Sequence, residues 1–470
     1  MRYLSTRGDA PSLAFDDVVL AGLARDGGLY MPEYWPTLSQ DDLRDLRRLS
    51  YPELTARILA LFTEPVISET ELAPLVEDAY SGFDGYPDIA PLKPLRAGEW
   101  LLELFHGPTL AFKDYPLQVL GRLFDLVLAR RGERITVLGA TSCDTGSAAI
   151  EACRDRETLD IFIMHPRGRV SEVQRRQMTT VVAENVHNIA IDGTFDDCQD
   201  LVKALFNDVR FRDRFRLGAV NSINWARIAA QIVYYVHAAL MLGAPDRAVA
   251  FAVPTGNFGN VFAAYAAARM GVPIARLIIG SNRNDILTRF FASGRMQIGQ
   301  VFTTLSPSMD IQISSNFERY LFELYDREAR TISGLMQRLR EDRAFSVNPE
   351  RFERTRQTFA ASCCDDERTK QVIRAVWEES GELIDPHTAI GIAAARDAVL
   401  PADIPVAAVG TAHPAKFPDA VEAATGIRPP LPARLAHLLR GREQYQALPA
   451  DAGRLRAAIA ETMDARGVNA

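Results

Sequence analysis

From about residue 134 onward, short β-branched runs alternate with segments of helical periodicity, and no other sequence feature constrains the fold as strongly. This order of elements predicts right-handed βαβ units built around parallel sheets. A long helical pattern at 224–242 separates two groups of runs, which predicts two α/β lobes with a cleft between them. The predicted strands are residues 134–140, 159–164, 186–191, 248–253, 276–279 and 406–409, and the first three are followed by helices at 147–154, 171–180 and 195–207.

The sequence predicts a chain of three parts. Residues 1–85 contain short, charged helical stretches and no clear strand pairs, which predicts a small, mainly helical N-terminal domain. Residues 86–430 carry the two lobes, the smaller of them at about 134–215, and residues 431–470 form a helical tail rich in Ala, Arg and Asp. The predicted fold class is α/β, with parallel sheets flanked by helices.

Charge and cysteine content exclude several classes of protein. The net charge of -7 argues against nucleic acid as a partner, because proteins that bind a phosphate backbone usually carry a basic surface. Five cysteines without a C-x-x-C pair indicate neither a disulfide framework nor a zinc ribbon. Residues 1–12 lack the apolar core of a signal peptide, and no stretch approaches the roughly 18 apolar residues of a membrane span. We therefore expect a cytoplasmic protein with no membrane partner and no metal.

Two loops between a predicted strand and a predicted helix are candidates for binding anions. Residues 139–146 (G-A-T-S-C-D-T-G) place small and hydroxyl side chains at a helix start, where free N–H groups and the helix dipole favour a carboxylate or phosphate. An ordinary capped helix, with Thr141, Ser142 or Asp144 as N-cap, explains this loop as well. Residues 254–260 (P-T-G-N-F-G-N) have two glycines three apart, which allow close backbone approach to a phosphate. This second loop matches neither a P-loop nor G-x-G-x-x-G.

Three further segments carry residues suited to catalysis or binding. In residues 106–116 (H-G-P-T-L-A-F-K-D-Y-P), Lys113 follows an apolar stretch. A partly buried amine is suited to act as nucleophile and base, although a solvated lysine paired with Asp114 fits as well. Residues 221–227 (N-S-I-N-W-A-R) end in an arginine that would clamp an anion or simply lie exposed. Residues 410–417 (G-T-A-H-P-A-K-F) place the Thr411 hydroxyl at a strand end, where it would meet a ring nitrogen or cap a turn.

Taken together, these five segments resemble the threonine synthase family, in the same order and across nearly the whole chain. M-R-Y-L-S-T-R-G at the N-terminus and D-G-G-L-Y-M-P at 26–32 are similar to that family's opening segment. H-G-P-T-L-A-F-K-D resembles its cofactor-lysine motif, and G-A-T-S-C-D-T-G resembles its substrate-carboxylate loop. P-T-G-N-F-G-N resembles the loop around the cofactor phosphate, and N-S-I-N-W-A-R resembles the substrate-phosphate site. G-T-A-H-P-A-K-F resembles the segment whose threonine faces the pyridine nitrogen of the cofactor.

The resemblance implies a pyridoxal 5'-phosphate (PLP) enzyme of fold type II. Its reaction would convert O-phospho-L-homoserine and water to L-threonine and phosphate, the last step of threonine biosynthesis. Lys113 would attach the cofactor covalently and move protons at the substrate Cα and Cβ, in a monomer or homodimer. The implied cofactor contacts are Lys113, Gly256, Asn257, Phe258, Gly259, Asn260, Asp144 and Thr411. The implied substrate contacts are Thr141, Ser142, Thr145, Asn221, Ser222, Asn224 and Arg227.

One position departs from the family's pattern, because Cys143 stands where the family usually has glycine. If this position requires a positive φ, a Cβ costs roughly 1 kcal/mol and tilts the loop. Two alternatives to the implied function stay open. A related threonine or serine dehydratase would bind the cofactor without needing a second phosphate site. A non-catalytic relative would bind the cofactor or phosphorylated ligands without turnover.

Overall fold

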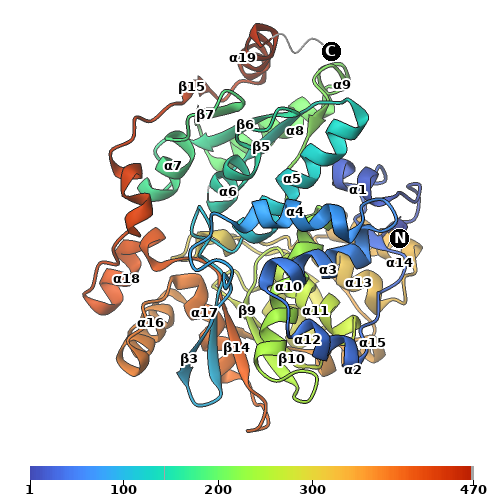
Figure 1. Cartoon of the computed structure of the whole chain (residues 1–470), viewed down its shortest axis with the longest axis vertical. Coiled ribbons are helices and arrows are strands. Elements are labelled where there is room, and N and C mark those ends of the chain that lie inside the picture. Colours follow the sequence, from blue (N-terminus) through green and yellow to red (C-terminus); the bar gives the residue numbers. More distant parts are fainter. Residues whose placement is uncertain (142, 467–470) are drawn as a thin grey trace. The chain divides into compact units, whose positions relative to one another are not determined.

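The computed structural model describes residues 1–141 and 143–466, and the chain divides into two compact units. The first unit comprises Met1–Pro116 and Ser222–Pro430, and the second comprises Leu117–Asn221 and Leu431–Ala470. Each unit is built around a largely parallel sheet with helices beside it, which confirms the predicted fold class (Figure 1). The three-part division predicted from the sequence is a different partition of the chain and stays a prediction.

The first unit is centred on a six-stranded sheet with the order β13-β10-β9-β14-β4-β3. Neighbouring strands are parallel except at the edge, where β3 pairs antiparallel with β4. β9 is buried at every position, and its sequence V-A-F-A-V-P is accordingly a continuous apolar run. Three of these strands, β9, β10 and β14, confirm the strands predicted in this region. The bounds are β3 (Leu92–Arg96), β4 (Glu99–Glu103), β9 (Val249–Pro254), β10 (Ile274–Ser281), β13 (Phe359–Cys363) and β14 (Val406–Gly410).

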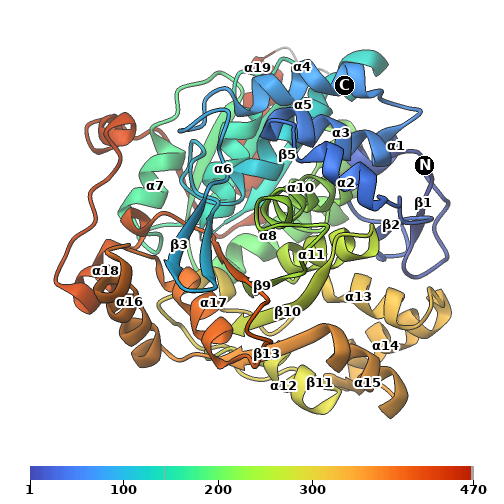
Figure 2. The ribbon, with the colours of Figure 1, turned by 60° about the horizontal axis from the view of Figure 1, so that its bottom comes forward.

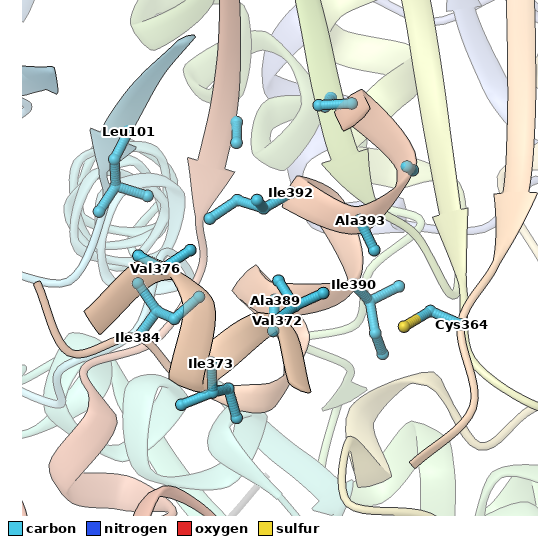
Figure 3. Packing of buried hydrophobic residues seen from close by; sticks show 14 of the residues in the cluster. Leu101, Cys364, Val372, Ile373, Val376, Ile384, Ala389, Ile390, Ile392 and Ala393 are labelled. Carbon is cyan, nitrogen blue, oxygen red and sulfur yellow. The ribbon is translucent and has the colours of Figure 1, made fainter. Parts of the chain in front are cut away.

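Helix α17 (Pro386–Asp397) lies on this sheet beside β9 and β14, and α16 (Asp366–Ser380) packs against α17 (Figures 1 and 2). They share an apolar cluster that includes Ile373 of α16, Ile390 of α17 and Leu101 of β4 (Figure 3). The cluster also includes Ala252 of β9 and Ala408 of β14, so it supports these two strands. In open α/β sheets, the loops that follow such strand ends usually carry the binding site.

The long helix predicted at 224–242 is confirmed as α10 (Trp225–Met241). Almost every residue of α10 is buried, because the helix packs against α11 (Gly259–Arg269) and also against α3 (Tyr51–Thr63) of the N-terminal segment (Figure 2). A helix surrounded in this way is mostly apolar on all sides, and the buried Arg227 and Gln231 are among its few polar residues.

Residues 1–85 are mainly helical, with α1 (Phe15–Ala21), α2 (Gln40–Leu46), α3 and α4 (Glu69–Tyr80). Capping boxes begin α2, α3 and α4. This segment also contains an antiparallel pair formed by β1 (Tyr3–Ser5) and β2 (Tyr30–Pro32). The prediction of no strand pairs is therefore wrong, because strands of three residues are too short to show alternation in the sequence.

The second unit is centred on a five-stranded parallel sheet with the order β15-β7-β6-β5-β8. Its first three strands and the helices after them confirm the predicted alternation. The tail, predicted as helical, contains a helix but also β15, which pairs with β7. Leu455 and Ile459 of α19 join the apolar core, so the tail completes this unit. The bounds are β5 (Ile135–Ala140), α6 (Asp144–Cys153), β6 (Leu159–Pro166), α7 (Glu172–Thr179), β7 (Val186–Asp192), α8 (Phe195–Asn207), β15 (Gln446–Pro449) and α19 (Ala452–Ala465).

The remaining elements complete the two units. In the first unit they are α12 (Ile286–Ser293), β11 (Arg295–Gln297), η1 (Pro307–Met309), α13 (Phe317–Leu324), α14 (Ala329–Glu341), β12 (Ala344–Ser346), α15 (Pro349–Thr358), η2 (Pro414–Lys416) and α18 (Pro418–Thr425). In the second they are α9 (Val209–Arg214), β8 (Leu217–Gly218), η3 (Ala433–Leu439) and most of α5 (Asp114–Arg131). None of the helices in the described residues is long and apolar enough to cross a bilayer.

Candidate active site

Lys113 lies on the segment that joins β4 to α5, and only 8% of the residue is exposed. The backbone just before it is tied to the segment that follows β14. The Phe112 N–H donates to the Thr411 carbonyl (2.9 Å), and Ala111 and Ala412 form an antiparallel bridge. Two residues predicted from distant motifs, Lys113 and Thr411, therefore lie on adjoining backbone segments. The alternative of a solvated lysine is wrong, because Lys113 is buried.

Asp114, the residue after the lysine, is fully buried and fixes this turn. Its carboxylate accepts hydrogen bonds from the Thr109 N–H (2.8 Å) and the Thr109 hydroxyl (2.6 Å). Burial raises the pKa of Asp114 to about 6, although the Thr109 bonds and the Lys416 ammonium act in the opposite direction. A Cβ on Gly107 would lie 2.4 Å from the Asp114 Cβ, so only glycine fits there. The motif is thus a compact turn that presents the lysine in one position.

The loop of residues 254–260, between β9 and α11, presents a row of backbone donors. Within the described residues, the N–H groups of 257–260 donate to no protein acceptor. The Asn260 Oδ1 accepts from the Tyr234 hydroxyl (2.6 Å) and the Tyr235 hydroxyl (2.7 Å). The buried Asn260 Nδ2 has no partner in the same part of the chain. Four N–H groups at a helix start, next to a buried amide donor, are suited to holding a phosphate.

Phe258 gives this loop its shape. Its φ of +62° is a left-handed conformation that is rare for a bulky residue and costs roughly 1 kcal/mol. The ring is buried among other aromatic rings, with its centroid 5.0 Å from that of Phe317 and 5.8 Å from that of Phe359. This packing holds the strained backbone in place, so the loop N–H groups are arranged before a ligand binds.

Arg227 lies in the first turn of α10, and its guanidinium is buried. Its Nε and Nη1 have no hydrogen-bond partner among the described residues. Burial lowers the pKa of Arg227 to about 10. A buried charge without a partner is costly, and an anionic ligand would relieve that cost. The geometry therefore indicates an anion site at the position where the sequence predicts the substrate phosphate, and the contact itself stays a prediction.

The residues just before Arg227 have structural contacts of their own. The Asn224 Oδ1 accepts the Ala226 N–H (3.0 Å), and its Nδ2 donates to the Val19 carbonyl (2.8 Å), so its amide caps α10 and anchors the N-terminal segment. Ser222 is half-buried and begins the second stretch of the first unit. Asn221 belongs to the second unit. Contacts between these three residues and the substrate stay a prediction.

In the second unit, residues 139–146 join β5 to α6. The Thr141 hydroxyl oxygen accepts the Gly146 N–H (3.1 Å) of the first turn of α6, but the N-cap is Cys143, so the alternative interpretation names the wrong N-cap residue. The half-buried Thr145 has no hydrogen-bond partner for its hydroxyl among the described residues. Ser142 lies outside the described residues. A role in binding the substrate carboxylate stays a prediction for all three.

Asp144 is buried at the first position of α6. Its Oδ1 accepts a hydrogen bond from the Gln174 Nε2 on α7 (2.7 Å), and the Gln174 Oε1 accepts one from the Ser171 hydroxyl (2.9 Å). This chain orients the carboxylate within the second unit. The predicted contact of Asp144 with the cofactor stays a prediction.

Cys143 has a φ of -150°, which is extended backbone that any residue adopts. The condition for strain at this position is therefore not met. We expect Cys143→Gly to lower the free energy of unfolding by about 0.5–1 kcal/mol, because glycine gains entropy in the unfolded chain. Turnover should stay within about threefold of the parent protein. Thermal unfolding and steady-state kinetics test this, and a tenfold gain in kcat would show instead that the thiol impairs catalysis.

Sequence reasoning missed a hydrogen-bond chain behind Thr411. The Thr411 N–H donates to the Thr388 Oγ1 (3.2 Å), and the Thr388 hydroxyl donates to the fully buried Asp385 carboxylate. The D-P pair at the start of α17 predicts a helix start, with Asp as N-cap and Pro at N1. It does not reveal that this start supports a strand end. The Thr411 hydroxyl has no partner among the described residues and stays available as a donor.

These features fit the parts of pyridoxal phosphate. The Lys113 amine suits its aldehyde, the 257–260 N–H groups and Asn260 amide suit its phosphate, and the Thr411 hydroxyl suits its ring nitrogen. Residues 90–337 match the family described as pyridoxal-phosphate dependent enzyme. The protein is a pyridoxal-phosphate-dependent enzyme of fold type II.

Comparison with known proteins narrows this class. Residues 2–80 match the family described as threonine synthase N terminus, and residues 388–459 match threonine synthase, C-terminal. The chain is 52% identical to threonine synthase from Pseudomonas aeruginosa over 98% of both chains. Its structure is similar to a PLP-bound threonine synthase from Brucella melitensis (TM-score 0.96, 50% identity, 98% of this chain and 99% of that chain). A threonine synthase from yeast is also similar (TM-score 0.94, 38% identity, 98% and 99%). The chain belongs to the threonine synthase family of lyases, which confirms the resemblance seen in the sequence.

Proposed function

We propose that the protein converts O-phospho-L-homoserine and water to L-threonine and phosphate. The observation that carries this proposal is a second anion site in addition to the cofactor-phosphate loop. Arg227 keeps a buried guanidinium without protein partners for two nitrogens in the described residues. A dehydratase acting on free threonine or serine needs no such charge, whereas a substrate with its own phosphate does.

Lys113 is the proposed covalent anchor and proton carrier. Its burial excludes bulk water from the amine, and the turn fixed by Asp114 holds it at one place. When bound, the cofactor supplies an electron sink that stabilises negative charge on the substrate carbons. Lys113 would take and return protons at the substrate Cα and Cβ. The neutral Thr411 hydroxyl would donate to the ring nitrogen without protonating it.

Arg227 is the proposed clamp for the leaving group. In the net reaction a C–O bond breaks at Cγ, where phosphate leaves, and a C–O bond to water's oxygen forms at Cβ. Cβ loses a proton and Cγ gains one, and the second proton of water goes to the departing phosphate, so atoms and charge balance. A guanidinium held in a dry site would bind the phosphate dianion and favour its departure. Asn221, Ser222 and Asn224 would complete this site.

The loop of residues 139–146 is proposed to bind the substrate carboxylate through Thr141, Ser142 and Thr145, with Asp144 as a cofactor contact. The other partners follow from bulk properties. The substrate is a small molecule, and the acidic chain, with its net charge of -7, favours neither nucleic acid nor an anionic membrane surface. We place the protein in the cytoplasm as a monomer or homodimer.

A steady-state phosphate-release assay on the purified holoenzyme tests the proposed function. We expect turnover of O-phospho-L-homoserine with L-threonine as product, and little deamination of free threonine or serine. Preferential deamination of free threonine would favour the dehydratase instead. Cofactor binding without turnover of either substrate would favour the non-catalytic relative.

A further inference from the structure

Asn316 and Arg319, at the start of α13, are completely buried. They contact two segments of the first unit: residues 254–260, called here the cofactor-phosphate loop, and residues 222–224, called here the substrate-phosphate loop. The Asn316 N–H donates to the Asn257 carbonyl (3.0 Å). The Asn316 Nδ2 donates to the Ser222 carbonyl (3.1 Å). One residue therefore contacts the cofactor-phosphate loop and the substrate-phosphate loop at once.

Arg319 extends these contacts to the N-terminal segment. Its Nη2 donates to the Ile223 carbonyl (2.6 Å), and its Nη2 and Nε donate to the Tyr30 carbonyl (3.1 and 3.2 Å). Its Nη1 donates to the Asn316 Oδ1. The guanidinium thus holds carbonyls of β2 and of the substrate-phosphate loop together.

Arg319 carries a buried charge whose hydrogen-bond partners are neutral oxygens. Burial lowers the pKa of Arg319 to about 9, and the Glu318 carboxylate acts in the opposite direction. The guanidinium donates to the Tyr30 and Ile223 carbonyls and to the Asn316 Oδ1. An apolar side chain at this position would leave these buried acceptors without a donor, so the guanidinium is needed to hold the three groups together.

The same hydrogen bonds also fix the direction in which the peptide groups of both loops point. In a trans peptide the C=O and N–H bonds point in opposite directions. The Ser222 and Ile223 carbonyls point toward Asn316 and Arg319, so the N–H groups of the residues that follow each of them point away from this pair. The bond to the Asn257 carbonyl does the same for the Phe258 N–H, and the bond from the Ser314 hydroxyl to the Gly256 carbonyl (2.7 Å) does so one residue earlier. Both loops thereby present backbone N–H groups on the side away from Asn316 and Arg319.

We propose that Asn316 and Arg319 are positioning residues for the substrate phosphate. They orient the N–H groups of both loops and place a buried positive charge behind them without touching the ligand. This proposal rests on the proposed function of the two loops. It also gives residues 1–85 a role, since the Tyr30 carbonyl that Arg319 binds belongs to that segment.

Arg319→Lys tests the proposal, because lysine keeps the charge but its ammonium cannot span the same carbonyls. We expect the KM for O-phospho-L-homoserine to rise about tenfold or more, with kcat within about threefold. The reason is that the loss of one hydrogen bond to a charged donor changes an equilibrium constant by about tenfold. Arg247→Lys is the matched control. Arg247 also donates Nε and Nη2 to one carbonyl, that of Asp403 (3.0 and 2.7 Å), but on an exposed loop. The control should leave KM unchanged.

Asn316→Asp provides a second variant that is nearly isosteric. The carboxylate would pair well with Arg319 but would repel the Ser222 carbonyl, so we expect an unchanged or raised melting temperature and a KM raised at least tenfold. A purely structural role predicts the opposite pattern, with a changed melting temperature and the parental KM. That pattern in both variants would overturn the proposal.

Inorganic phosphate separates this proposal from the proposed function. Phosphate should raise the melting temperature of the parent holoenzyme, and raise that of both variants by less than half as much. This readout needs no turnover. If the parent protein does not turn over O-phospho-L-homoserine but the variants still lose the phosphate effect, the proposed function fails and the positioning role stands. Equal phosphate effects in parent and variants would end the positioning role whatever the activity.

Discussion

Lys113→Ala is expected to lower kcat by at least about a thousand-fold, because it removes the proposed covalent anchor of the cofactor and the proposed proton carrier at the substrate carbons. The variant should bind PLP only through the phosphate loop and the ring contacts, so its visible absorption should shift to that of the free aldehyde. Borohydride reduction followed by peptide mapping should give an adduct at residue 113 in the parent protein and none in the variant. Phosphate release from O-phospho-L-homoserine measures the loss of turnover.

Lys203→Ala is the control for this experiment, since Lys203 lies exposed on α8 and pairs with a neighbouring surface carboxylate, that of Asp200 (2.9 Å). Its adduct, absorption and kcat should equal those of the parent. Lys113→Ala should melt within a few degrees of the parent apoprotein, because Asp114 and Thr109 hold the turn without the amine. Retention of more than about a tenth of the parental kcat, or a borohydride adduct on another lysine, would contradict the assignment of Lys113.

The main strands could be predicted because they are buried on both faces and must therefore be apolar throughout. β9, for example, is buried at all positions, and its sequence V-A-F-A-V-P is an uninterrupted apolar run. β15 escaped prediction for the opposite reason, since its four residues are mostly exposed and their composition shows no strand signal. It is a strand only because β7 offers an edge to pair with, and that edge lies far away in the sequence. Tertiary pairing of this kind leaves no local pattern.

The candidate site also contains residues that the sequence predicts and residues that it does not reveal. Lys113, the loop of residues 254–260 and Arg227 lie in motifs whose residue types are tied to their chemistry, so the sequence predicted them. Asn316 and Arg319 lie at an ordinary helix start, and their partners are carbonyl groups, which every residue has. Residue type therefore does not show which backbone carbonyls accept a hydrogen bond from a distant side chain. The supporting contacts could therefore be found only once the chain was folded.

Arg227→Met is expected to raise the KM for O-phospho-L-homoserine by about a hundredfold or more, the usual effect of removing one partner from a buried, hydrogen-bonded charge pair. Methionine keeps an unbranched side chain of comparable reach without the charge. The cofactor should stay bound with its normal absorption, because the 257–260 donors and Lys113 are unchanged. Steady-state kinetics with varied substrate and the visible spectrum of the holoenzyme measure the two effects.

The same substitution should weaken substrate binding without destabilising the substrate-free protein. The buried guanidinium has two nitrogens without partners in the described residues, so removing its charge should leave the melting temperature of the substrate-free holoenzyme unchanged or higher. Inorganic phosphate should then stabilise the parent protein but not the variant. Arg247→Met, on an exposed loop, is the control and should behave as the parent in kinetics and phosphate response. A parental KM in Arg227→Met, or an undiminished phosphate effect, would remove Arg227 from the anion site and with it the reason to prefer a phosphorylated substrate.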